Sequence, residues 1–103
     1  MTAEARALLR SVADRLEALA ARTTAGDWRV GGLLASRPDV VAHRTDGGTE
    51  HVAEARERSA AWIAALSPAV AGPLVTVLRL AAGREPVEPA ALELARALAA
   101  RLP

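Results

Sequence analysis

The first twenty-two positions carry apolar residues at helical spacing. Five side chains form one stripe, separated by intervals of one, three, four and three residues: Leu8, Leu9, Val12, Leu16 and Leu19. Alanine fills much of the remainder, which favours helix because its side chain loses no conformational freedom on folding. The pattern stops at the turn-forming sequence RTTAGD, so we expect an amphipathic helix over residues 1–22, capped by Thr2.

Residues 27–54 have a different character, because Val, Thr and Gly replace the alanine-rich pattern. Apolar runs bounded by turn residues predict four short strands: Trp28–Val30, Leu33–Ala35, Val40–Arg44 and Glu50–Ala53. The sequence Asp46-Gly47-Gly48 suits a hairpin connection, since glycine adopts positive φ at little cost. This β section therefore predicts a small antiparallel meander.

Helical patterns return over residues 55–82 and again over 88–102. Ser67-Pro68 resembles a helix N-cap followed by Pro at the first helical position, and Pro73 is unfavourable inside a helix. We therefore expect a short turn at Pro68–Ala71, between a helix that ends near Leu66 and one that runs from about Pro73 to Ala82. The whole pattern predicts an α+β fold, in which a small antiparallel β-meander packs against about four helices in a single domain, residues 1–103.

The composition indicates that the two tryptophans contribute much of the buried apolar surface. The chain is 51% hydrophobic, but 26 of its residues are Ala and it contains no Phe or Tyr. A tryptophan buries roughly 150–250 Å². We therefore expect Trp62 to anchor its helix against the sheet and the N-terminal helix, and Trp28 to pack nearby. The alternative is that either residue is an exposed anchor for recognition.

Charge and targeting signals narrow the class of protein. Thirteen basic residues, all Arg, are balanced by twelve acidic ones without clustering, so nucleic-acid binding is unlikely on these grounds. The Arg-only, Ala-rich bias is typical of GC-rich, actinobacterial-type genomes. The N-terminus lacks the apolar region of a signal peptide, and no uninterrupted apolar run approaches 18 residues. We therefore expect a cytoplasmic protein that is not associated with a membrane.

The chain offers little for catalysis or metal binding. It has no Cys, no Gly-x-Ser-x-Gly elbow and no phosphate-binding loop. His43 and His51 face each other across the predicted hairpin, with Asp46, Glu50 and Glu54 near in sequence, but their spacing matches no metal motif. We expect no catalytic residue, no cofactor and no metal site, and so a protein that is not an enzyme.

Both tryptophan segments carry a family resemblance. TTAGDW at Thr23–Trp28 is similar to a Thr-Pro-Gly-Pro-Trp signature, and SAAWIAALSPAVAGPLVTVLR at Ser59–Arg79 is similar to an Asp-Ala-Ala-Phe-Ile-Ala-Ala-Ala-x-Pro signature followed by a Leu-rich helix. Over roughly residues 5–80 the chain resembles the Ead-like family, early-region accessory proteins of lambdoid phages and prophages with actinobacterial relatives. It departs from the signatures at Ala25, Asp27 and Ser59.

This resemblance implies a small accessory protein without enzymatic activity, which acts by binding a protein partner. The alternative is a regulatory protein that binds nucleic acid. The leucine stripe of the N-terminal helix has coiled-coil spacing but spans less than two heptads, so we expect it to pack on its own domain and also across the two-fold axis of a homodimer.

Overall fold

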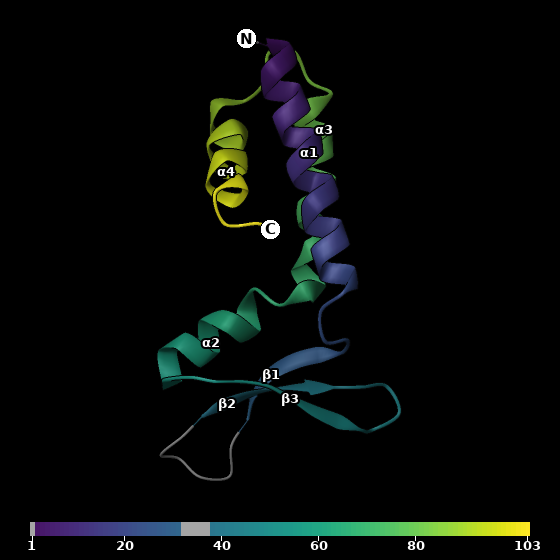
Figure 1. The fold of residues 1–103 in the computed structure, drawn as a ribbon, viewed down its shortest axis with the longest axis vertical. Coiled ribbons are helices and arrows are strands. Elements are labelled where there is room, and N and C mark those ends of the chain that lie inside the picture. The colour runs from purple at the N-terminus through teal and green to yellow at the C-terminus, as the bar shows by residue number, and fades with distance from the viewer. Residues whose placement is uncertain (1, 32–37) are drawn as a thin grey trace. The chain divides into compact units, whose positions relative to one another are not determined.

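The computed structural model describes residues 2–31 and 38–103, and Figure 1 shows its arrangement. It combines a three-stranded antiparallel sheet with α-helices, which confirms the α+β class. The chain divides into two compact units, one formed by Met1–Arg22 with Ala71–Pro103 and the other by Thr23–Val70. The single domain expected from the sequence stays a prediction, because two compact units can belong to one domain.

The first unit is helical. It contains α1 (Thr2–Ala21), α3 (Ala71–Ala82) and α4 (Pro89–Ala99), and α1 packs against both of the others (Figure 1). The predicted leucine stripe lies at this contact: Leu9 and Val12 are buried, Leu8 and Leu16 pack on the core, and Leu19 is half-buried. The side chain of Thr2, the expected cap, lies outside the described part of the chain.

Helix α3 begins at Ala71, two residues before the start that the sequence predicts. Pro73 is therefore the third residue of the helix and not its first. The N–H groups of a first turn have no acceptor within the helix, so the N–H that Pro73 lacks removes no helical hydrogen bond. The buried residues of α3, which include Val75, Leu78 and Ala82, face α1 and α4.

Charged side chains tie the helices of this unit together at its surface. The guanidinium of Arg79 on α3 lies 2.9 Å from the Asp14 carboxylate and 3.1 Å from that of Glu17, both on α1. The guanidinium donates hydrogen bonds to Glu17 and to Asp14, and these bonds, Glu17 first, raise the pKa of Arg79 above its ordinary value. The triad is solvent-exposed, so it orients α3 on α1 more than it stabilises the unit.

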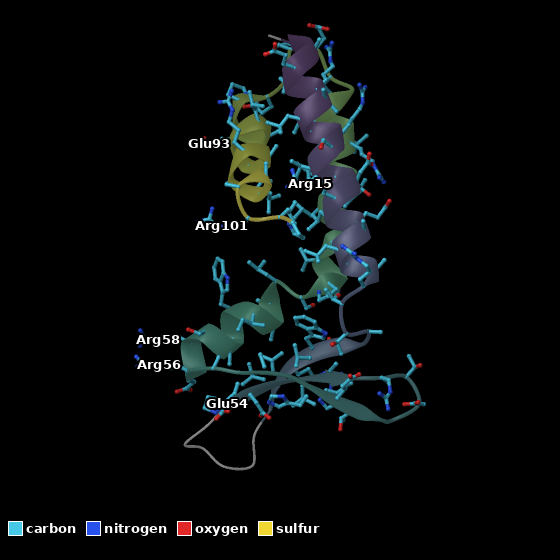
Figure 2. The ribbon with its side chains drawn as sticks, viewed as in Figure 1. Arg15, Glu54, Arg56, Arg58, Glu93 and Arg101 are labelled. Carbon is cyan, nitrogen blue, oxygen red and sulfur yellow. The ribbon has the colours of Figure 1, made fainter. Side chains whose placement is uncertain are left out.

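Arg15 fixes the end of α4 from the neighbouring helix. Its guanidinium donates to the carbonyl oxygens of Ala99 at 3.3 Å, Leu102 at 2.9 Å and Pro103 at 3.4 Å. Figure 2 labels Arg15 on α1, near the chain that follows α4. Carbonyl groups in a last helical turn have no partner within the helix, so Arg15 satisfies acceptors that would otherwise need water.

The second unit holds the sheet. Strands β1 (Asp27–Gly31), β2 (Asp39–His43) and β3 (Thr49–Glu54) lie in the order β1-β2-β3, all antiparallel, as the meander requires. The predicted strand at Leu33–Ala35 lies outside the described residues. Gly47 has a φ of 86° in the β2–β3 hairpin, the left-handed conformation for which the sequence suggested glycine.

A helix and a short turn complete the second unit. Helix α2 (Glu57–Ala65) is followed by the single 3₁₀ turn η1 (Pro68–Val70), close to the positions that the sequence predicts. The buried Ser67 hydroxyl accepts a hydrogen bond from the Ala69 N–H at 3.3 Å, so Ser67 caps this turn as expected.

The core of the first unit predicts the effect of shortening one leucine. Leu78 is fully buried on α3, whereas Leu80 on the same helix is 58% exposed. We expect Leu78→Ala to lower the free energy of unfolding by about 2–5 kcal/mol, because it removes buried apolar surface and leaves a cavity. Leu80→Ala is the matched control and should change it by less than about 0.5 kcal/mol. Urea unfolding of both variants measures the difference, and equal effects would contradict the orientation of α3.

The Arg15 contacts predict a local effect on α4. We expect Arg15→Ala to lower the free energy of unfolding by roughly 1–2 kcal/mol and to speed amide exchange in the last turn of α4, because the capped carbonyls lose a charged donor. Arg10→Ala on the same helix is the control, since Arg10 is exposed and makes no hydrogen bond or ion pair with the described residues. Hydrogen exchange measured by NMR tests this, and unchanged exchange at Ala99 would exclude the capping role.

Candidate functional site

Helix α2 lies on the sheet through small side chains. Ala60 is completely buried, and so are Val40 and Ala42 on β2, the strand at the centre of the sheet. Ile63 and Ala64 are half-buried on the same side of the helix. Figure 1 shows α2 lying over the sheet. Because alanine projects only a methyl group, a helix that packs through Ala60 can lie close to the strands.

Trp62 lies on the opposite side of α2 and is 69% exposed. The expectation that it anchors its helix in the core is therefore wrong. A residue two positions beyond Ala60 is rotated by about 200° around a helix, so burying Ala60 directs Trp62 into solvent. The size of the side chain suggested burial, but the helical phase of the small residues decided its position.

Trp62 belongs to a continuous strip that we call the outer α2 stripe, defined as Arg58, Trp62 and Leu66. These residues are spaced four apart and lie one above the other along the helix. Leu66, just beyond the last turn of α2, is 55% exposed. The stripe thus presents an aromatic and an aliphatic side chain beside a cation.

The arginines at the start of α2 are not neutralised by their neighbours. In the sequence, Glu54 and Glu57 stand next to Arg56 and Arg58. In the structure neither guanidinium makes an ion pair or a hydrogen bond with the described residues. Both project from the N-terminal end of α2 in Figure 2. Leu66 and these two arginines are the site residues that sequence reasoning missed. Their spacing of four from Trp62 is the signal that could have identified Arg58 and Leu66.

Trp28 has a structural position, unlike Trp62. It lies on β1 opposite Ala42, which places it on the face of the sheet that α2 covers. The side chain is half-buried, and its indole N–H donates to the Thr24 carbonyl oxygen at 2.9 Å. This bond joins β1 to the segment before it, so Trp28 packs within its own unit and is not available as a recognition anchor.

The two histidines lie on the face of the sheet that α2 leaves open. His43 pairs with Thr49 and His51 with Val41, so the histidines are diagonal neighbours on β2 and β3. The His51 Nε2 is 3.6 Å from the Asp39 Oδ2. Among the described residues no three His, Cys, Asp or Glu side chains are grouped so that they could hold a metal ion.

One segment is more apolar than the sequence analysis recognised. Glu57–Ala82 is long and apolar enough to cross a membrane by length and composition alone. Its helical structure is interrupted between α2 and α3 by η1, and a bilayer span needs uninterrupted backbone hydrogen bonding. The segment also contains four large apolar side chains that remain exposed: Trp62, Leu66, Val77 and Leu80. Exposed apolar residues indicate an interaction site where they lie together, as Trp62 and Leu66 do one turn apart on α2.

No family model matches this chain, and neither a curated protein nor a solved structure is similar to it at a significant level. The resemblance to the Ead-like family therefore stays a prediction that depends on the two tryptophan segments alone.

The different positions of the two tryptophans predict different fluorescence. In Trp28→Phe the remaining emission comes from exposed Trp62, and we expect it to be red-shifted and strongly quenched by acrylamide. In Trp62→Phe the remaining Trp28 is half-buried and hydrogen-bonded, so its emission should be bluer and quenched less. Stern–Volmer plots of the two variants test this. A similar slope in both would contradict the exposure of Trp62.

Proposed function

We propose that this protein is a non-catalytic accessory protein of phage or prophage type, which binds a protein partner through the outer α2 stripe in the cytoplasm. One observation carries the proposal. Trp62, the most exposed large apolar side chain of the described residues, lies on α2 between Arg58 and Leu66, and Arg58 makes no ion pair with another residue of the described ranges.

The chemistry of the stripe supports protein binding. Tryptophan and arginine are the residues most enriched where a few side chains provide most of the binding energy of an interface. Exposing an indole to water costs free energy that a partner recovers by covering it. Burial of Ala60 on the opposite side of α2 holds the helix in place, so little conformational entropy is lost when the stripe is bound.

The family resemblance supports the accessory role. The second signature, Ser59–Arg79, contains Trp62 and Leu66, and a resemblance to early-region phage proteins favours binding of another protein over catalysis. The leucine stripe of α1 packs on α3 and α4 of the same chain, as expected, and its pairing with a second copy stays a prediction.

A second candidate function, binding of single-stranded nucleic acid, has one observation in its favour. An exposed aromatic beside unpaired arginines is the combination on which bases stack while phosphates are neutralised. Arg56 and Arg58 flank Trp62 in this way. The overall charge of +1 provides little further attraction for a phosphate backbone, so protein binding is favoured.

Pull-down from a lysate of the native host tests the proposed function. We expect the parent and Leu80→Ala, another exposed leucine variant, to retain the same specific protein, and Trp62→Ala to lose it by at least about tenfold. Trp62→Ala should unfold at nearly the parent's urea concentration, because the side chain is mostly exposed.

Capture that is unchanged in Trp62→Ala would contradict the proposal. A fluorescence titration with labelled single-stranded DNA, at several salt concentrations, tests the second candidate in parallel. A steep fall in affinity with salt, together with loss of binding in Trp62→Ala, would favour nucleic acid instead.

A further inference from the structure

A cavity of about 400 Å³ lies within the helical unit, between α1, α4 and the connector that precedes α4. Its described lining comes from all three: Glu4, Ala5 and Leu8 on α1, Pro86 and Val87 in the connector, and Leu92 and Arg96 on α4. Both helices run away from the connector, so Pro86 and Val87 lie at one end of the cavity (Figure 1). A volume of this size is typical of pockets that bind small molecules.

One small side chain on α1 creates this space. The apolar stripe of the helix contains Leu8 and Leu9, and helical spacing continues the stripe backward to position 5, three and four residues earlier. Position 5 is alanine, and this residue is half-buried in the cavity wall. A leucine at this position would extend into the cavity, whereas the methyl group of Ala5 leaves room for a ligand.

The connector end of the cavity is held in place by contacts within the unit. Arg6 on α1 makes an ion pair with Glu85 and donates a hydrogen bond to the Arg84 carbonyl oxygen at 3.3 Å. Val87 packs on the apolar core. This wall is therefore formed before a ligand arrives, so binding requires little further ordering of the chain.

The lining combines apolar surface with a guanidinium. Leu8, Val87 and Leu92 are half-buried and offer apolar contact. Arg96 is the only cation among the described lining residues, and it lies one turn beyond Leu92 on the same side of α4. It makes no side-chain ion pair or hydrogen bond with residues 2–31 and 38–103. A guanidinium of this kind binds a carboxylate through two parallel hydrogen bonds.

Glu4 adds a second requirement for the ligand. It lies in the first turn of α1, near the connector, whereas Arg96 lies in the last turn of α4. Because the two helices run in the same direction, these charges lie toward opposite ends of the cavity (Figure 1). A ligand whose carboxylate binds Arg96 therefore extends toward Glu4, and the Glu4 carboxylate repels a second negative charge at that end.

We propose that this cavity binds an aliphatic monocarboxylate of medium chain length. The carboxylate pairs with Arg96, and the uncharged tail lies along Leu92, Leu8 and Val87 toward the connector. An aliphatic amine at Glu4 would form a single-point contact, so the bidentate pair with Arg96 favours the carboxylate as head group. The site belongs to the helical unit and not to the unit that carries the outer α2 stripe, so it adds a ligand to the proposed protein-binding function.

Filling the cavity tests the proposal, with octanoate as the probe and calorimetric titration of the full chain as the measurement. Affinity should rise from butanoate to octanoate by about two- to fourfold per methylene, because each methylene buries apolar surface. Ala5→Leu should lower the affinity for octanoate at least about tenfold. It should not lower the midpoint of urea unfolding, since its side chain occupies a cavity. Ala7→Leu makes the same change at an exposed position of α1 and should bind octanoate like the parent.

The charged residues are tested separately. Arg96→Gln should lower the affinity for octanoate by about three- to tenfold, because the carboxylate loses its charged donor at a partly solvated site. Arg10→Gln is the matched control, since Arg10 is exposed on α1 and is not part of the lining. Octanedioate, which carries a carboxylate at each end, should bind the parent more weakly than octanoate, and Glu4→Gln should reduce this difference.

Amide chemical shifts locate the bound octanoate and decide the outcome. We expect shifts at Leu8, Val87 and Leu92, and an affinity that Trp62→Ala leaves unchanged. Shifts confined to other residues, or affinity that depends on Trp62, would overturn the proposal by showing that the probe binds elsewhere. Unchanged binding in Ala5→Leu, or tighter binding of octylamine than of octanoate, would also overturn it. Each of these results leaves the pull-down test of the outer α2 stripe unaffected.

Discussion

Contact of Ala60 with the central strand of the sheet is the constraint on which the candidate site depends. A helix packed through a methyl group sits close to its sheet, and its rotation is fixed by whichever side carries the small residues. Burying Ala60 over Val40 and Ala42 therefore requires the residues at Arg58, Trp62 and Leu66 to point outward. The same packing that orders the second unit leaves Trp62 exposed, and this side chain is the centre of the binding site that we propose.

The helical unit is packed through larger side chains than the contact of α2 with the sheet, because its core contains leucine and valine. Leu9 and Val12 on α1 meet Leu78 on α3, and this contact uses the apolar stripe that otherwise resembles half of a coiled coil. At the surface of this unit, Arg79 binds two carboxylates of α1, and Arg15 donates hydrogen bonds to carbonyl groups at the end of α4. Both arginines are thereby occupied within the chain. Arg58 has no such acceptor among residues 2–31 and 38–103, which is why we include it in the proposed binding site.

These differences between arginines are important for a protein whose total charge is almost balanced. A net charge of +1 predicts no strong field around the molecule, so attraction at long range is weak. Recognition then depends on single unpaired charges placed beside apolar surface, where water is excluded when the partner binds. Arg58 beside exposed Trp62 has this arrangement, and it belongs to the stripe that we propose as the binding site.

The sequence by itself determined the secondary-structure elements. Leucine spacing identified α1, the Ser67-Pro68 and Gly47 signals placed a turn and a hairpin, and three described strands lie where alternation and turn residues put them. These features depend on interactions between near neighbours, which a linear pattern records. For the same reason the sequence identified the leucine stripe as apolar, but only the structure shows that α3 and α4 pack on it, and its pairing with a second copy stays a prediction.

Only the tertiary structure decided which of the two tryptophans is packed and which is exposed. Trp28 stands between Asp27 and Arg29 in the sequence and Trp62 in an alanine-rich run, yet Trp28 packs on the covered face of the sheet and Trp62 faces solvent. Side-chain size predicts how much surface burial removes from water, but it does not say which side of a helix meets its neighbour. Several residues together decide which side of α2 meets the sheet, because the side with Ala60 allows the closest packing against Val40 and Ala42. It depends on residues twenty positions apart in the sequence, which become neighbours only when the strand and the helix have come together.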